Sequence, residues 1–138
     1  MNKENTETLM KDFPSLYRGA KQPPTQNLMC FGFECDDGWF GLIYDLSRKL
    51  FDICPRVKAA QVKEKFGTLR FYVECVQANK ADKVYSVIQE AEIESGKICE
   101  NCGSKKKVKC KSTGGSYWIK TLCEECRRKD EDKRKGNK

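Results

Sequence analysis

Two closely spaced pairs of cysteines near the end of this 138-residue chain constrain its fold more than any other feature. Cys99 and Cys102 form one C-x-x-C pair, and Cys123 and Cys126 form the other, with residues 103–122 between them. Two residues between paired cysteines allow both sulfur atoms to reach one ion, and the overall spacing is typical of a four-cysteine zinc site. Because four thiolates leave no open coordination position, the pattern predicts one structural Zn²⁺.

The segment around and between the two pairs predicts a small zinc ribbon. Gly103 follows the first pair directly and suits a tight turn. Residues 106–111 and 117–122 are expected to form two strands, joined by a turn at residues 112–115. The second pair opens a charged, helix-compatible segment at residues 124–134. A cysteine turn, a hairpin and a second pair at a helix start are typical of a treble-clef-like zinc ribbon.

Other roles for the nine cysteines remain open from the sequence. The four paired cysteines could be unrelated buried thiols, whereas a redox function is disfavoured because neither pair follows a thioredoxin-like βαβ pattern. Cys30 and Cys35 have a looser C-x4-C spacing that leaves a second metal site open, although core packing is the usual role of such residues. Cys110 lies inside the ribbon, where it could compete for zinc or pack in the ribbon core.

The chain contains no histidine. This absence excludes Ser-His-Asp and Cys-His catalysis, H-E-x-x-H zinc proteases and zinc fingers with mixed ligands. Glu34, Asp36 and Asp37 form the acidic cluster that could serve an enzyme, but helix capping accounts for both aspartates without chemistry. We therefore expect a binding protein rather than an enzyme, with no catalytic residues.

The N-terminal end shows no targeting signal. Its sequence, MNKENTETLMKDF, is polar and lacks the hydrophobic stretch of a signal peptide. The most apolar stretch, residues 39–46, is interrupted by Gly41 and Asp45 and is far too short to span a bilayer. The sequence therefore predicts a cytoplasmic protein without membrane contact, in which cysteines are free thiols or metal ligands.

Upstream of the cysteine pairs, the hydrophobic pattern predicts an α+β core domain in which a small sheet packs with two helices. The expected elements are a strand at residues 29–35, a helix from near Trp39 to Pro55, a β-hairpin at residues 57–75 and a helix at residues 78–97. The hairpin turns around Phe66, Gly67 and Thr68, with Val62 and Phe66 on its apolar side.

Composition divides the chain into four regions. Residues 1–28 read as a polar N-terminal segment and connector, in which residues 6–13 are expected to form a short helix. The core domain follows at residues 29–97, and the zinc ribbon at residues 98–128. The charged tail, residues 129–138, is expected to fray.

The excess positive charge lies in the C-terminal part of the chain. There are 27 lysines plus arginines and 20 acidic residues, for a formal net charge of +7. Residues 1–98 contain 14 of each kind, so the excess comes from the 13 basic and 6 acidic residues of residues 99–138. One Zn²⁺ with four thiolates would add −2 and leave about +5 on the metal-loaded protein.

Basic side chains of the ribbon interleave with aromatic ones. The residues concerned are Lys105, Lys106, Lys107, Lys109 and Lys111 on the first strand and its approach, Tyr117 and Trp118 on the facing strand, and Arg127 and Arg128 after the last cysteine. Such a pattern suits phosphate contact with base stacking, so we expect nucleic acid or an anionic nucleotide as a partner. The alternative is that the lysines solubilise the module and offset its negative zinc–thiolate centre.

A second basic patch is predicted on the polar face of the hairpin. Its members are Lys63, Lys65, Arg70 and Tyr72. Depending on the register of the two strands, they could form one site for an anionic ligand. The alternative is an ordinary solvated sheet face whose charges pair with Glu64 and Glu74.

The strings DDGWFGLIYDLS and QVKEKFGTLRFYVE, followed by a C-x-x-C pair, resemble a family of small, mostly uncharacterised phage, prophage and bacterial proteins. The resemblance covers residues from about 31 to 126, and the hairpin string is its most specific part. It implies a G-W helix, a V-K-E-K-F-G-T-L-R-F-Y hairpin and a C-terminal cysteine knuckle, in a bacterial or phage-infected cell. It implies no reaction and no catalytic residues.

Three functions follow from these observations. The first is a zinc-ribbon protein of phage or mobile-element type that contacts nucleic acid or a nucleotide through its basic C-terminal module. The second is an inhibitor of a host defence system that acts by protein–protein contact, since small phage accessory proteins often act on host machinery. The third is a carboxylate-dependent enzyme, which the sequence supports least.

Overall fold

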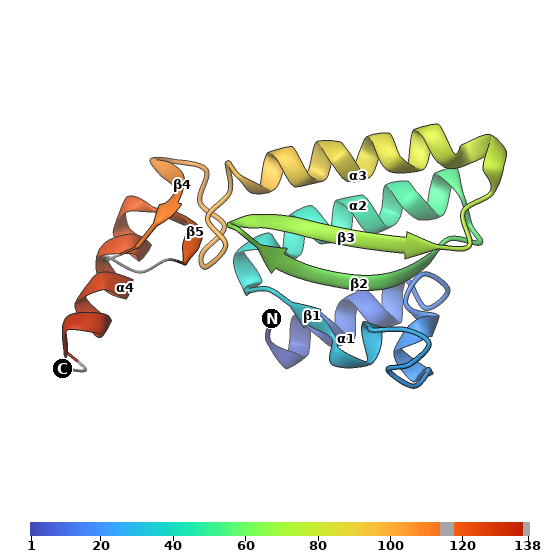
Figure 1. Cartoon of the computed structure of the whole chain (residues 1–138), viewed down its shortest axis with the longest axis horizontal. Coiled ribbons are helices and arrows are strands. Elements are labelled where there is room, and N and C mark those ends of the chain that lie inside the picture. Colours follow the sequence, from blue (N-terminus) through green and yellow to red (C-terminus); the bar gives the residue numbers. More distant parts are fainter. Residues whose placement is uncertain (114–117, 137–138) are drawn as a thin grey trace.

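The computed structural model describes residues 1–113 and 118–136. In this described part, four α-helices and two β-sheets form an α+β fold (Figure 1). The predicted fold class is therefore confirmed. The core domain and the C-terminal module lie side by side, joined at one end of the hairpin (Figure 1). None of the described helices is long and apolar enough to cross a membrane.

The core sheet has the order β1-β2-β3. β2 (Lys58–Lys65) and β3 (Thr68–Glu74) are antiparallel, as the alternation in residues 57–75 predicts. β1 (Phe33–Glu34) pairs in parallel with β2 and places Phe33 opposite Val62. The predicted hairpin is confirmed, and a register shift in β2 near Ala59 bends it.

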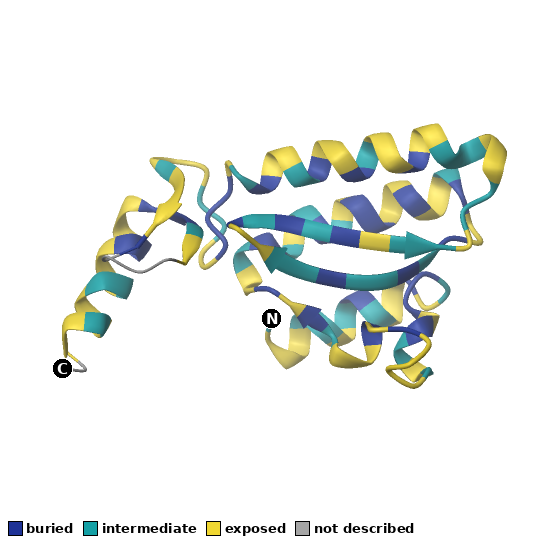
Figure 2. Ribbon diagram, in the orientation of Figure 1, coloured by how far each residue is buried: buried dark blue, intermediate teal, exposed yellow. Residues whose placement is uncertain are grey.

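Two helices cover the sheet. α2 (Phe40–Ile53) and α3 (Ala81–Ser95) run side by side along the hairpin, and each turns a buried stripe toward it (Figures 1 and 2). The stripes comprise Ile43, Leu46 and Leu50 on α2 and Val84, Ile88 and Ala91 on α3. Their spacing of three to four residues is what the sequence periodicity predicts.

The N-terminal segment also belongs to this core. α1 (Lys3–Asp12) buries Leu9, and Phe13, Leu16 and Tyr17 join the same hydrophobic cluster as the sheet and helices. The Tyr17 hydroxyl lies 2.6 Å from the Ser47 hydroxyl, so its polar atom is satisfied inside the core. Residues 1–28 thus supply a layer of packing that their polar composition does not suggest.

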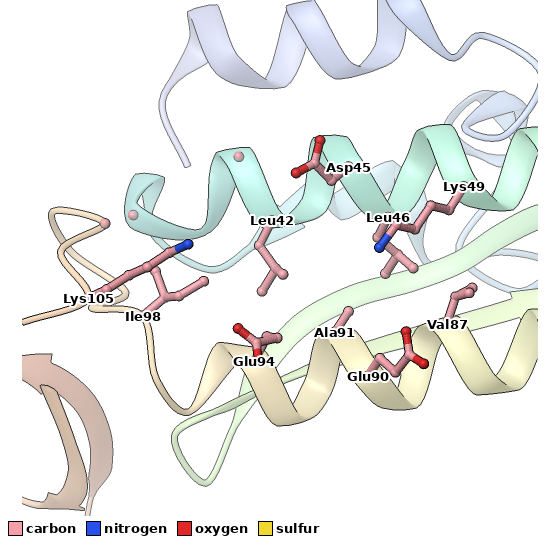
Figure 3. Close-up of a pocket in the computed structure, with 13 residues that line it drawn as sticks. Leu42, Asp45, Leu46, Lys49, Val87, Glu90, Ala91, Glu94, Ile98 and Lys105 are labelled. Carbon is pink, nitrogen blue, oxygen red and sulfur yellow. The ribbon is translucent and has the colours of Figure 1, made fainter.

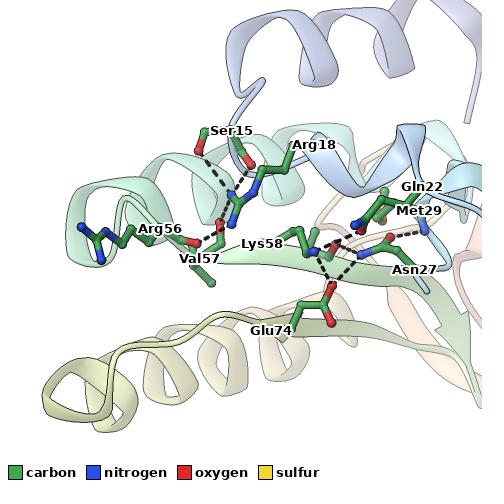
Figure 4. A network of polar contacts seen from close by, with 10 residues as sticks. Ser15, Arg18, Gln22, Asn27, Met29, Arg56, Val57, Lys58 and Glu74 are labelled. Carbon is green, nitrogen blue, oxygen red and sulfur yellow. Dashed lines mark hydrogen bonds and ion pairs between the residues drawn. The ribbon is translucent and has the colours of Figure 1, made fainter.

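Polar contacts fix the connector after α1 against the sheet (Figure 4). The Arg18 guanidinium donates to the carbonyl oxygens of Arg56 (2.8 Å) and Val57 (3.2 Å). The Glu74 carboxylate accepts from Asn27 Nδ2 at 2.9 Å and forms an ion pair with Lys58 at 3.1 Å. These contacts replace hydrogen bonds that regular secondary structure would otherwise provide.

Two local predictions are wrong. Met29–Phe31 form a 3-10 turn rather than part of a strand, because Gly32 adopts φ +72 and reverses the chain just before β1. Asp36 and Asp37 do not cap α2. The helix begins as a continuation of the 3-10 turn Asp37–Trp39, and Asp37 Oδ1 instead accepts from the Asn2 backbone amide at 2.7 Å.

The C-terminal module consists of β4 (Val108–Ser112), β5 (Ile119–Cys123) and α4 (Glu124–Gly136). The predicted hairpin and following helix are present, with each strand shifted by about two residues toward the C-terminus. The expected fraying tail is wrong for residues 129–136, which continue α4. Ion pairs between residues four apart, such as Arg128–Glu124 and Arg134–Asp130, support these charged turns.

Further 3-10 turns connect the main elements. They are Arg18–Lys21 after α1 and Ala78–Lys80 at the start of α3.

Candidate metal centre and basic surfaces

All four predicted metal ligands meet at one point between the core and α4. The Sγ atoms of Cys99, Cys102, Cys123 and Cys126 lie within 4.8 Å of one another. Cys123 ends β5 and Cys126 lies in the first turn of α4, so the strand-to-helix junction sets their spacing. All four are free thiols. This arrangement can hold one metal ion.

Backbone geometry aims hydrogen-bond donors at the sulfur atoms. Gly103 adopts φ +82 and donates its amide to the Cys99 carbonyl at 2.9 Å, which closes the first turn. The Cys126 amide donates to Cys123 Sγ at 3.4 Å, and Asn101 Nδ2 donates to Cys126 Sγ at 3.3 Å. Donors of this kind stabilise thiolates, the form of cysteine that binds metal.

The four thiols differ in how easily they ionise. Burial opposes ionisation of Cys99, but backbone amides of Cys102, Cys123 and Asn101 lower its pKa to about 7. Burial raises the pKa of Cys126 to about 12, and the neighbouring sulfur atoms add to this effect. Ionising all four together therefore requires a cation among them, which a bound divalent metal supplies.

The other five cysteines lie apart from this centre. Cys35 and Cys54 are buried in the core, which is the packing role expected by default. Cys30 is exposed, and the described residues contain no second group of three or more metal-binding side chains. Cys110 points to the Phe66 carbonyl oxygen at 3.7 Å rather than to the other thiols. Within the described part of the chain, these residues thus form no competing site.

Main-chain contacts attach the first cysteine turn to the core. The Gly38 amide donates to the Glu100 carbonyl at 2.7 Å, and Trp39 Nε1 donates to the Ile98 carbonyl at 2.9 Å. A Cβ on Gly38 would lie 2.1 Å from the Cys99 carbonyl oxygen, so glycine is required for this approach. The Glu100 carboxylate accepts from the Asp36 amide at 3.0 Å, and burial raises its pKa to about 7.

The tip of the β2–β3 hairpin contacts the module from the other side. Thr121 Oγ1 donates to the Gly67 carbonyl oxygen. Gly67 adopts φ +85, and a Cβ there would lie 2.6 Å from Cys110 Sγ. The core and the module therefore share two tight backbone junctions, one at Gly38 and one at Gly67.

Five of the predicted basic residues line one pocket between β4, β5 and α4, which we call the basic cleft. Its volume is about 520 Å³, and its walls comprise Lys107, Lys109, Lys111, Arg127 and Arg128 together with Leu122, Glu124 and Glu131. Glu124 forms ion pairs with Lys107 at 3.5 Å and Arg128 at 3.8 Å. Five cations and two carboxylates line the cleft, so its walls carry a net positive charge.

Arg127 plays a different part from the one predicted. Its side chain is buried, with 7% of the residue exposed. The guanidinium donates to the carbonyl oxygens of Lys109 (2.6 Å), Lys120 (2.9 Å) and Lys111 (3.3 Å). These three hydrogen bonds occupy donors of the guanidinium. Arg127 therefore holds both ribbon strands against α4 and shapes the cleft, instead of contacting a ligand directly.

The remaining predicted contacts are dispersed. Lys105 lines a separate groove between α2 and α3, with Leu42 and Val87 on its walls and Asp45 on its rim (Figure 3). Lys106 is exposed, and its backbone amide donates to Ser104 Oγ. Trp118 lies beside the hairpin tip, away from the cleft, and Tyr117 lies outside the described residues. The expected interleaving of lysines with both aromatics is therefore not seen within the described residues.

The second basic patch shares one face of the core sheet. Lys63 lies directly opposite Arg70, and Lys65 and Tyr72 follow two residues along their strands on that face. Glu64 lies opposite Leu69 on the other face, and Glu74 pairs with Lys58. Neither glutamate therefore pairs with the patch: Glu64 points to the opposite face and Glu74 pairs with Lys58. Arg70 Nε is buried and makes no hydrogen bond to any described residue.

The acidic cluster considered for catalysis serves the fold. Asp37 Oδ1 accepts from the amide of Asn2 and from Asn5 Nδ2, and Glu34 Oε1 accepts from Gln61 Nε2 at 3.3 Å. Each contact ties separate segments of the core together. Asp36 lines a pocket with Asn101 and Lys120, whereas Glu34 and Asp37 make the hydrogen bonds described above.

Phe66 is the surface residue that the alternation pattern misplaced. It was predicted on the apolar face of the hairpin, but it occupies the turn and 64% of it is exposed. A two-residue turn at Phe66 and Gly67 puts the aromatic ring at the tip of the hairpin, beyond the reach of the core. The Phe-Gly dipeptide between two alternating runs was the signal that could have located it.

Comparison of the chain with protein-family models, with curated proteins and with solved structures returned no match.

Proposed function

We propose that this chain is a zinc protein whose C-terminal module contacts nucleic acid, or an anionic nucleotide, through the basic cleft. The observation that supports it is the convergence in one pocket of four exposed basic side chains, those of Lys107, Lys109, Lys111 and Arg128. The same pocket is built directly on the strand-to-helix junction that carries two of the cysteines. The metal would therefore hold the walls of the cleft in place.

Zinc is the metal that suits the four thiols best. A tetrahedral Zn²⁺ with bonds of about 2.3 Å places its sulfur ligands about 3.8 Å apart. The Sγ atoms of Cys102 and Cys123 lie 3.7 Å apart, close to that separation. Soft thiolates in a closed set of four favour Zn²⁺ over harder divalent cations.

Phosphate groups suit the cleft better than a neutral ligand. Lys109 and Lys111 are exposed on one face of β4, two residues apart, and lie opposite Leu122 and Lys120 of the neighbouring strand. Glu124 is shared by two cations, so it neutralises only part of the charge. Lysines displayed in this way contact phosphates without reading sequence, so we expect non-specific and salt-dependent binding.

Fluorescence anisotropy with labelled oligonucleotides tests this proposal. Replacing Lys109 and Lys111 with alanine should reduce affinity about tenfold and lower the salt slope by about two, because each phosphate contact contributes about 0.9. A control that removes two exposed lysines elsewhere, Lys11→Ala with Lys83→Ala, should retain the wild-type slope. Affinity that stays flat between about 50 and 200 mM salt, or equal losses in both variants, would overturn the proposal.

A protein partner is the second candidate function, and the groove between α2 and α3 favours it (Figure 3). Its walls include Leu42 and Val87, and its charged lining residues are Asp45, Glu90 and Glu94 together with Lys49 and Lys105. Three carboxylates against two ammonium groups leave a small negative excess around apolar walls, which suits an amphipathic helix with basic side chains. In the phage setting that the family resemblance implies, such a partner would be a host protein.

Co-purification separates the two functions. A host partner bound in this groove should survive nuclease treatment, be retained at about one copy per chain and be lost on Val87→Lys. Ile93→Lys, on an exposed position of the same helix, is the matched control. Retention of the partner by Val87→Lys would exclude the groove as its site.

A further inference from the structure

We propose that the hairpin tip and the adjoining sheet face form a second surface, which binds single-stranded nucleic acid by stacking its bases. This inference rests on the proposed function in that the same chain contacts nucleic acid, but it uses other residues. Its centre is a pocket of about 420 Å³ shared by the two parts of the molecule. The pocket is lined by Phe66, Trp118, Ile119, Glu64, Lys65 and Lys120.

Two large aromatic rings are presented to solvent at this pocket. Phe66 is 64% exposed and Trp118 is 69% exposed. Phe66 lies in the turn of the core hairpin and Trp118 directly precedes β5, so the two rings are more than fifty positions apart in the chain. Exposed rings of this size contribute little to folding, whereas each offers a flat face on which a base can stack.

Phe66 also has an unusual backbone conformation. Its φ is +54, in the left-handed region that turns of this kind normally fill with asparagine, aspartate or glycine. Phenylalanine disfavours that conformation and gains no burial from it here. A strained residue with an exposed ring is better explained by a surface function than by stability.

The platform is held rigidly. The Phe66 carbonyl oxygen accepts a hydrogen bond from Cys110 Sγ at 3.7 Å, and the Gly67 carbonyl oxygen accepts one from Thr121 Oγ1. Gly67 packs so closely on the module that an alanine there would clash with Cys110. These contacts fix the backbone that carries Phe66, so the turn itself loses little conformational entropy on binding.

Positive charge leads up to the platform along the sheet. Lys63, Lys65 and Arg70 share the exposed face that ends at the turn, and the Lys65 ammonium lies 5.5 Å from the centre of the Phe66 ring. Tyr72 continues the same face and is 45% exposed. It lies four residues from Thr68, or about 13 Å along the strand, which leaves room for a short run of nucleotides.

These features select a single strand as the occupant. Phosphates would lie along the lysines and Arg70, while unpaired bases reach the rings of Phe66, Trp118 and Tyr72. A duplex keeps its base faces stacked internally and cannot use the platform. A purely apolar protein partner would leave the neighbouring cations without counterions.

The platform is separate from the basic cleft. In the β4–β5 ladder, Cys110 lies opposite Thr121 on the face that meets the hairpin tip. Lys109 lies opposite Leu122 on the other face, which lines the cleft. The basic cleft and the platform pocket have no lining residue in common, so variants can disable either surface alone.

Binding of oligothymidylate of about 15 nucleotides, compared with a duplex of the same length, tests the inference. Phe66→Asn and Trp118→Ala should each weaken single-strand binding at least fivefold and leave duplex binding unchanged. Asparagine suits the turn, so Phe66→Asn should fold at least as well as the wild type. Phe66→Tyr keeps a ring and should retain binding.

Tryptophan fluorescence gives an independent measurement. Trp39 is fully buried, so quenching by the single strand should report Trp118 and disappear in Trp118→Phe. Unchanged single-strand affinity in both platform variants, or equal losses for single strand and duplex, would overturn the inference. If only Lys109→Ala with Lys111→Ala weakens binding, the platform is excluded and the cleft stands; if only the platform variants do so, the cleft is excluded.

Discussion

The core domain and the C-terminal module are stabilised in different ways. The core buries one continuous cluster drawn from α1, the sheet, α2 and α3. In the module, three of the four cysteines are buried with Leu122, and Val108 packs beside them. So small a hydrophobic cluster stabilises little structure on its own, so a metal bound by the four cysteines would take the place of a core there.

The two regions also differ in what joins them. Inside the core, side chains form one continuous hydrophobic cluster, whereas the junction with the module is made by hydrogen bonds and by close backbone approaches at Gly38 and Gly67. Such a junction tolerates no added side chain. We expect the module to unfold without the core when the metal is lost, whereas a change at the junction should affect both regions.

Metal removal should produce the largest effect. Cys99→Ser or Cys123→Ser should abolish the binding of about one zinc per chain and unfold the module, because metal ligation at such sites contributes about 10 kcal/mol or more. The core should remain folded, as followed by NMR and metal analysis. Cys75→Ser, at an exposed thiol outside the cluster, should change neither. Unfolding of the core together with the module would show that the core also depends on the metal.

A cavity in the core should produce the next largest effect. Leu50 is fully buried in α2, so Leu50→Ala should lower the free energy of unfolding by about 2–5 kcal/mol. The zinc content should stay at one per chain because the ligands are untouched. The neighbouring Phe51 is 45% exposed, and Phe51→Ala should change stability far less. Loss of zinc from the folded Leu50→Ala protein would show that the two regions are not independent.

The junction should be sensitive to a single methyl group. Gly38→Ala would place a Cβ against the carbonyl oxygens of Cys99 and Glu100, at 2.1 and 2.4 Å. The backbones must then move apart, at a cost of about 1–3 kcal/mol measured by denaturant unfolding. Gly41 lies in α2 with open space around it, so Gly41→Ala should instead be neutral or stabilising. Equal stability of the two variants would argue against a tight junction.

Acid should weaken the core slightly through Glu74. The ion pair with Lys58 and the hydrogen bond from Asn27 lower the pKa of this carboxyl. Its contribution is present above the unfolded pKa of about 4.3 and is lost as the pH falls through the lower pKa of the folded state. Glu74→Gln should remove this dependence, an effect of at most about 1 kcal/mol for a partly exposed pair.

Urea unfolding between pH 3 and 6 would measure this effect, with the exposed Glu90→Gln as control. A steeper acid dependence in Glu74→Gln than in the wild type would contradict the assignment.

Sequence reasoning located the features that depend on near neighbours in the chain. The period-2 alternation of residues 57–75 and the helical spacing of Ile43, Leu46 and Leu50 each follow from local geometry. The four cysteines were found for the same reason, since a C-x-x-C turn is a local structure. Asp36 and Asp37 were misassigned because their partners, Glu100 and Asn2, lie far away in the sequence.

The α+β class, the four clustered cysteines and the concentration of positive charge in the last forty residues could all be predicted from the amino-acid sequence. Which of these charges act together depends on the tertiary structure. It buried Arg127 under three carbonyl oxygens, and it brought Phe66 to Trp118 across the junction. The physical reason is that periodicity and spacing encode local backbone geometry, whereas a surface shared by distant segments depends on how packed elements meet.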